Sequence, residues 1–126
     1  MDFSSRSFAD VVVAVPDGQI DHANAQVLQQ ALEPILSAPP ADTLALVLDF
    51  SHVEYISSMG LRVLMVAAKQ MRARGSRIAV AALGPTVKEI FDIARFGHVT
   101  EVFPSVDAAL EAISPNALAA FEARSR

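Results

Sequence analysis

Apolar positions along the chain fall into two patterns, short continuous runs and longer segments with a repeat of three and four residues. Four continuous runs predict strands, at residues 11–15, 44–48, 77–83 and 99–103. Four repeating segments predict amphipathic helices, at residues 27–36, 61–71, 86–95 and 106–113. Strands that alternate with helices through short connections predict an α/β domain, with a mixed sheet of about four or five strands packed with about four helices.

Several local signals set the expected ends of these elements. Pro16-Asp17-Gly18 predicts a turn after the first strand, because proline fixes φ and glycine permits positive φ. Asp21 or Asn24 is expected to cap the first helix. Pro39-Pro40 is expected to end that helix and to form a connector. Thr86-Val87-Lys88-Glu89 has the spacing of a capping box.

Composition indicates one globular domain, because 126 residues with 52% hydrophobic and 19% charged positions suit a single core. We expect the domain at residues 11–113, with a candidate first strand in residues 1–10 and a tail with helical character at 114–126. The chain has no cysteine, no apolar run near the ~20 residues of a membrane helix and no secretory leader pattern, so the expected location is cytoplasmic. A net charge of -4 argues against a nucleic-acid partner.

Ser57 and Ser58 lie where an apolar segment with its loop gives way to the second predicted helix. An exposed serine beside the free N–H groups of a helix start is well placed to hold an anion, including a phosphate bonded to the serine itself. Taken alone, both serines also fit ordinary roles as a helix cap and a first-turn residue.

Several separated segments resemble, in order and spacing, the STAS domain of anti-sigma factor antagonists. They are Gly18-Gln19-Ile20-Asp21-His22, LALVLDFSHVEYISSMGLRVL at 44–64 and GPTVKEIFDIARF at 84–96. The family motif is an aspartate, the phosphorylated serine, a small residue, a glycine and an aliphatic residue. The matching positions are Ser57, Ser58, Met59, Gly60 and Leu61. Ser57 in place of the aspartate and Met59 in place of the small residue depart from the motif.

The resemblance, which covers residues 11–113, implies a STAS-like fold and a protein switch that is not an enzyme and uses no cofactor. Without phosphate, such a domain binds an anti-sigma factor that is also a serine kinase, and this frees a sigma factor. Phosphorylation, at Ser58 or alternatively at Ser57, releases the partner, and a metal-dependent serine phosphatase resets the switch. The expected partner-binding residues are Asp21, His22, Ser57, Ser58, Met59, Gly60 and Arg62.

Two of these residues, Asp21 and Met59, each have two possible roles. Asp21 either caps a helix or contacts the kinase or a nucleotide, as the matching acidic position of the family suggests. Met59 is either an adaptable interface anchor or a core residue. Gly60 permits a close approach beside the serine. Arg62 follows Ser58 by four residues, a spacing that places both on one helical face, where Arg62 would steady the phosphate.

Two alternative functions compete with this interpretation. One is a STAS subunit that docks on a lipid or anion transporter. The other is a small serine hydrolase that uses Ser58, His22 and Asp21, although the glycine-x-serine-x-glycine elbow is missing. No metal site is expected, since His22, His52 and His98 lack paired ligand spacing. The apolar residues 63–68 are expected to pack a helix against the sheet and not to insert into a membrane.

Overall fold

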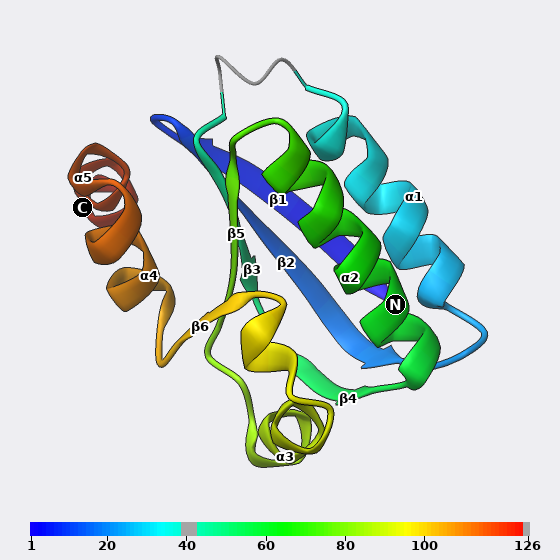
Figure 1. Ribbon diagram of the computed structural model, residues 1–126. Helices are drawn as coiled ribbons and strands as arrows, with labels where there is room; N and C mark the ends of the chain where they lie inside the picture. The colour runs from blue at the N-terminus through cyan, green and yellow to red at the C-terminus, as the bar shows by residue number, and fades with distance from the viewer. Residues whose placement is uncertain (39–42, 125–126) are drawn as a thin grey trace.

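The computed structural model describes residues 1–38 and 43–124, and within them a mixed sheet of six strands lies between two layers of helices (Figure 1). The strands are β1 (Asp2–Phe8), β2 (Val11–Ile20), β3 (Ala45–Asp49), β4 (Val53–Ile56), β5 (Arg77–Ala81) and β6 (Glu101–Phe103). The helices are α1 (Ala25–Leu36), α2 (Ser58–Ala73), α3 (Pro85–Ile93), α4 (Val106–Ile113) and α5 (Pro115–Ala123), with a 3₁₀ turn η2 (Phe96–His98).

The sheet has the order β1-β2-β3-β5-β6, and β4 pairs separately with the end of β2. β1 is antiparallel to β2, whereas every other pairing is parallel. Helices α1 and α2 lie on one face of the sheet, α4 and α5 on the other, and α3 lies near β4 at one end (Figure 1). The predicted mixed α/β architecture is therefore confirmed, with more strands and helices than the apolar runs alone indicated.

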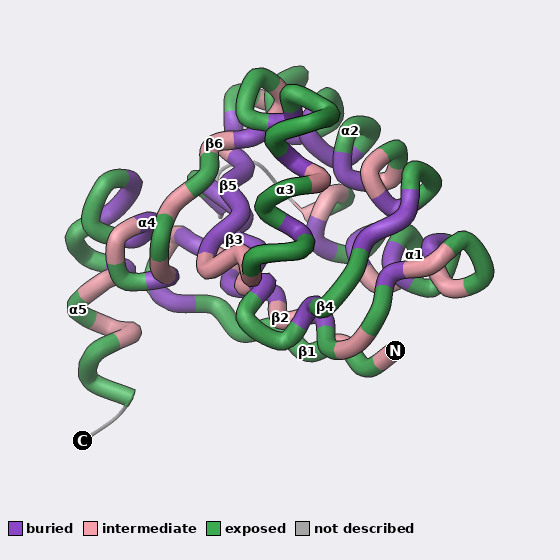
Figure 2. The backbone as a smooth tube through the Cα atoms, turned by 90° about the horizontal axis from the view of Figure 1, so that it is seen from below, coloured by how far each residue is buried: buried purple, intermediate pink, exposed green. Residues whose placement is uncertain are grey.

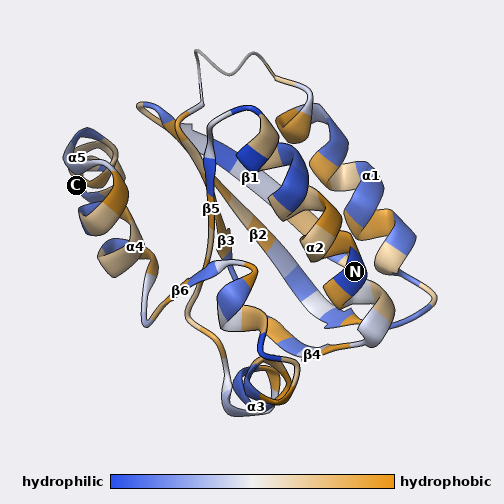
Figure 3. Ribbon diagram, viewed as in Figure 1, coloured by the Kyte–Doolittle hydropathy of each residue, from blue (hydrophilic) through white to orange (hydrophobic). Residues whose placement is uncertain are grey.

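Alternate residues of the central strands supply two apolar layers, because successive side chains of a strand point to opposite faces. Leu46 and Leu48 pack on the side of α1 and α2, together with Leu64 of α2. Val47 packs on the other side, with Leu110 of α4. All five side chains are completely buried, and the buried segments run through the middle of the molecule in Figure 2. Figure 3 shows the same central strands as hydrophobic along most of their length.

The predicted turn at Pro16-Asp17-Gly18 is wrong, because β2 continues through it to Ile20. Pro16 falls between the last pairing of β2 with β3, at Ala14, and its first pairing with β4, at Gly18. A missing N–H is tolerated at such a break in the ladder. Gly18 has a φ of +111° and precedes a shift in register, so the glycine forms an irregularity within the strand and not a turn.

Two other predicted boundaries changed, both of them in α3. The capping box at Thr86 is wrong, because α3 starts one residue earlier, at Pro85, with Gly84 as N-cap and no side-chain cap. α3 ends at Ile93, and Arg95 adopts a left-handed conformation before η2. α1 ends at Leu36, and the predicted connector Pro39-Pro40 lies outside the described residues.

Arg74 ties the end of α2 to the end of α1. Its Nη1 donates to the carbonyl oxygens of Leu36 at 2.8 Å and Ala38 at 2.7 Å, and its Nε donates to Ser76 Oγ at 3.2 Å. Ser76 Oγ in turn donates to the Thr43 carbonyl at 3.0 Å. These bonds satisfy carbonyls that the end of a helix leaves without partners, and they fix α1 beside α2.

We expect Arg74→Ala to lower the free energy of unfolding by about 2–3 kcal/mol, because charge-assisted hydrogen bonds to half-buried carbonyls are lost. Urea denaturation monitored by circular dichroism measures the change. Arg72→Ala is the matched control, since exposed Arg72 makes one longer bond, from Nη2 to the Val99 carbonyl at 3.3 Å. Equal losses in the two variants would contradict the role given to Arg74.

Candidate functional site

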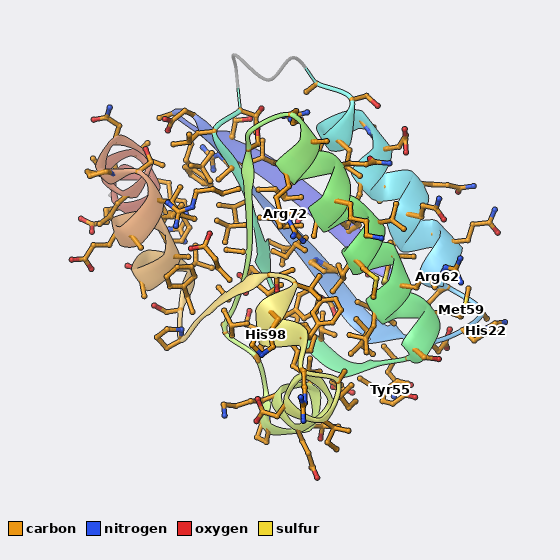
Figure 4. All side chains as sticks on the ribbon, viewed as in Figure 1. His22, Tyr55, Met59, Arg62, Arg72 and His98 are labelled. Atoms are coloured by element: carbon orange, nitrogen blue, oxygen red, sulfur yellow. The ribbon has the colours of Figure 1, made fainter. Side chains whose placement is uncertain are left out.

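The candidate site lies where β2 and β4 end side by side. The two strands are parallel, Ile20 pairs with Ile56, and the Ser57 N–H donates to the Ile20 carbonyl at 2.7 Å. The residues that follow each strand therefore meet at the same edge, although they are far apart in sequence. In Figure 4, His22 from the loop after β2 lies near Met59 and Arg62, around the first turns of α2.

Ser57 and Ser58 differ sharply in their surroundings. Ser57 is the N-cap of α2, is only 9% exposed, and its Oγ accepts a hydrogen bond from the Gly60 N–H at 3.1 Å. Ser58, the first residue of the helix, is exposed, and its hydroxyl has no hydrogen-bond partner among the described residues. Ser57 thus holds the helix start, while Ser58 presents its hydroxyl to solvent at the positive end of the helix dipole.

Asp21 and Asn24 form a reciprocal staple in the loop between β2 and α1. Asp21 Oδ1 accepts from the Asn24 N–H at 2.9 Å, and Asn24 Oδ1 accepts from the Asp21 N–H at 2.8 Å. Asn24 Nδ2 also donates to the Gln19 carbonyl at 2.6 Å. Asn24 occupies the N-cap position of α1, but its side chain bonds backward to the loop and not to the helix. Asp21 therefore shapes the loop that carries exposed His22.

The same bonds separate the three groups of the hydrolase hypothesis. The Asp21 carboxylate is bonded to the backbone of Asn24, and no hydrogen bond within residues 1–38 and 43–124 links Asp21 to His22 or His22 to Ser58. A nucleophile, base and orienting acid need such a chain of contacts. The geometry therefore does not support a serine relay at this edge.

Gly60 stands at the closest approach between α2 and the paired strands. A Cβ atom built on Gly60 would lie 2.7 Å from Ile20 Cγ2 and 2.7 Å from Ile56 Cγ1. Real carbon atoms do not approach so closely, so only glycine fits without displacement of these branched side chains. This contact explains in steric terms why a glycine lies two residues after Ser58.

Met59 and Arg62 are exposed on the first turns of α2. Met59 is 39% exposed and lines, with Arg62, a hollow of about 160 Å³ between α1 and α2. Of the two readings of Met59, a core residue is thus excluded. Arg62 and Ser58 line a second groove together on the other side of α2, as their four-residue spacing predicts.

The apolar segment 63–68 is only partly used for packing. Leu64, Ala67 and Ala68 are buried against the sheet, as expected, but Met65 is 39% and Val66 42% exposed. This exposure is not evident from the sequence, because a segment that is apolar on most sides gives a weak signal for its outer face. Within the part of the chain that the structure describes, no helix combines the length and apolar character needed to span a bilayer.

We expect Ser57→Ala to lower the free energy of unfolding by about 1 kcal/mol, because the Gly60 N–H loses its cap. Ser58→Ala is the matched control and should change stability by less than about 0.5 kcal/mol, since the Ser58 hydroxyl is exposed. Urea denaturation of both variants provides the measurement. A larger loss in Ser58→Ala than in Ser57→Ala would refute this division of roles.

Gly60→Ala should destabilise the protein by about 1–3 kcal/mol, because overpacking at Ile20 and Ile56 exceeds the ~1 kcal/mol gained from helix propensity. Gly97→Ala serves as the control, since a Cβ there meets no atom within 4 Å. Thermal unfolding followed by circular dichroism compares the two. A Gly60→Ala variant as stable as the parent would show that the strands yield to the added methyl group.

Comparisons with known proteins place this geometry in a family. The model of the STAS domain matches residues 4–109. The chain is 33% identical over 102 residues to a Bordetella bronchiseptica protein named "Putative anti-sigma factor antagonist BtrV". The aligned region covers 81% of this chain and 85% of that protein.

Solved structures agree with this assignment. An anti-sigma factor antagonist from Mycobacterium paratuberculosis is 25% identical, with a TM-score of 0.77 over 89% of this chain and 94% of that one. A protein from Thermotoga maritima is 20% identical and shares the fold, with a TM-score of 0.80 over 88% of this chain and 93% of that one. The protein belongs to the STAS domain family, and the proteins to which it is similar include anti-sigma factor antagonists.

Proposed function

We propose that the protein is a phosphorylation-controlled antagonist of an anti-sigma factor. Without phosphate it binds an anti-sigma factor that is also a serine kinase, and so relieves the inhibition of a sigma factor. Phosphorylation of Ser58 releases the partner, and a metal-dependent serine phosphatase restores the binding form. The similarity to anti-sigma factor antagonists supports the partner class.

The observation that carries the choice of Ser58 is the contrast between the two serines. The Ser57 hydroxyl is buried and accepts a bond from the Gly60 N–H, so its phosphorylation would break the helix cap. The Ser58 hydroxyl is exposed one residue later, where an approaching kinase reaches it without disturbing the fold. This contrast favours Ser58 over Ser57 as the phosphoacceptor.

The surroundings of Ser58 also suit a phosphate within this chain. A phosphate adds about -1.5 to -2 charges, and the N-terminus of a helix favours negative charge. Arg62 is exposed on the same side, and α2 contains no acidic residue. Ser57 replaces the aspartate of the family motif, so the cap adds no negative charge beside the phosphate. The fold should therefore survive the modification.

The phosphate would instead make the free energy of partner binding less favourable. A strongly hydrated dianion at the centre of an interface must lose water or repel partner carboxylates. A penalty of about 3 kcal/mol weakens association roughly a hundredfold, which is enough to release a partner of micromolar affinity at cellular concentrations. Exposed Met59 and His22 beside Ser58 would supply part of the contact surface that this charge disrupts.

Ser58→Glu should weaken binding to the cognate anti-sigma factor kinase by about a hundredfold, whereas Ser58→Ala should bind normally and resist release by ATP. Isothermal titration calorimetry measures binding, and fragment-resolving mass spectrometry after incubation with kinase and ATP locates the phosphate. Ser57→Ala is the control and should still accept phosphate on Ser58. Phosphate confined to another residue, or unchanged affinity of Ser58→Glu, would overturn the proposed switch.

A further inference from the structure

The exposed apolar side of α2 continues well beyond the serine. A groove of about 430 Å³ runs between α2 and the segment around η2 (Phe96–His98), and we call it the α2–η2 groove. Ser58 lies among its lining residues, together with Leu61, Arg62, Met65, Val66, Lys69, Ala94, Phe96 and Val99. Six of these nine residues are apolar. Met65, Val66 and Ala94 are exposed, whereas Leu61 and Val99 are half-buried and Phe96 is buried in the core.

The α2–η2 groove has dimensions that suit a helix. From Ser58 to Lys69 the wall formed by α2 extends about 16 Å along the helix axis, which equals about three helical turns. One hydrogen bond links α2 to the opposite wall, from Arg72 Nη2 to the Val99 carbonyl at 3.3 Å. A largely apolar groove of this length is the kind of surface that receives the apolar face of an amphipathic helix.

Charge indicates the chemistry of the occupant. The ionisable residues that line the groove are Arg62 and Lys69, and Arg72 follows them on the same helix. Neither the described lining of the groove nor α2 contains a carboxylate, although the whole chain has a net charge of -4. This local positive charge favours an acidic occupant by electrostatic complementarity.

We propose that the α2–η2 groove binds an acidic amphipathic helix of about three turns from the protein partner. This inference rests on the proposed function for the identity of the partner, and it adds the chemistry of the partner segment. Because Ser58 lines the same groove, a phosphate on Ser58 places negative charge beside the acidic occupant, and like-charge repulsion promotes release. A membrane surface is less favoured, since a concave groove fits a helix better than a plane.

The test uses a probe that does not require the natural partner. A synthetic 18-residue helix with leucine at i, i+3, i+4 and i+7 and glutamate elsewhere is titrated into ¹⁵N-labelled protein. A peptide with lysine in place of glutamate is titrated in parallel. We expect the acidic peptide to shift the amide signals of Leu61, Met65 and Val99 and to bind at least fivefold more tightly than the basic peptide.

Charge variants then localise the interaction. Lys69→Glu should weaken the acidic peptide at least fivefold, whereas Lys88→Glu makes the same change of net charge on α3, outside the groove, and should leave the affinity unchanged. Ser58→Glu should also weaken it. Equal binding of both peptides, equal effects of Lys69→Glu and Lys88→Glu, or shifts confined to α4 and α5 would overturn the groove assignment. So would binding to vesicles of anionic phospholipid that Lys69→Glu abolishes while the acidic peptide fails to bind.

The outcome is separable from the switch itself. If kinase and ATP phosphorylate Ser58 and release the partner but the acidic peptide does not bind, the groove inference fails and the proposed function stands. If the acidic peptide binds in the groove but Ser58 accepts no phosphate, the proposed switch fails and the groove assignment stands.

Discussion

The close contact of Gly60 with Ile20 and Ile56 is the constraint on which the site depends. Ile20 and Ile56 end two parallel paired strands, and the first turn of α2 lies directly against both side chains. The Ser57 N–H bonds to the Ile20 carbonyl, while its Oγ caps the Gly60 N–H. Gly60 thus allows the start of α2 to pack directly against the ends of β2 and β4. Any Cβ at this position would move the helix start away from the sheet and alter where Ser58 points.

This arrangement gives Ser57 the support of the helix start and leaves the adjacent Ser58 hydroxyl exposed for the signalling role that we propose. The buried Ser57 Oγ accepts the hydrogen bond that caps the helix. The Ser58 hydroxyl makes no hydrogen bond among the described residues. A switch of this kind needs such a separation, because a modification that also unfolded the domain would destroy the binding form and not merely release it. The staple between Asp21 and Asn24 serves the same end, since it fixes the neighbouring loop without using Ser58.

Sequence reasoning succeeded where the signal was local and failed where distant pairing decided the outcome. The buried run of β3 and the start of α2 follow from apolar period and from a serine cap, and both are present. Pro16-Asp17-Gly18 has the composition of a turn, but pairing of β2 with β4, more than thirty residues later, extends the strand through it. β1 was expected only as a candidate strand within residues 1–10, because Asp2–Phe8 is mostly exposed and polar and lacks a clear apolar pattern. The steric need for Gly60 depends on Ile20, forty residues earlier, which no local pattern reveals.

The charge on α2 connects these structural features with the control by phosphate that we propose. The whole chain is acidic, with a net charge of -4. α2 nevertheless carries Arg62, Lys69 and Arg72 and no carboxylate, so it creates a local electrostatic field of the opposite sign. A phosphate of about -2 on Ser58 would act mainly on Arg62, about 6 Å along the helix axis and within one Debye length of about 8 Å. Lys69, about 16 Å along the axis, would be largely screened from it. The proposed modification would therefore change both the shape and the local charge of the surface that a partner meets. Discrimination between the two states then arises from lost attraction as well as from added repulsion, which is a general route to specificity in protein interfaces.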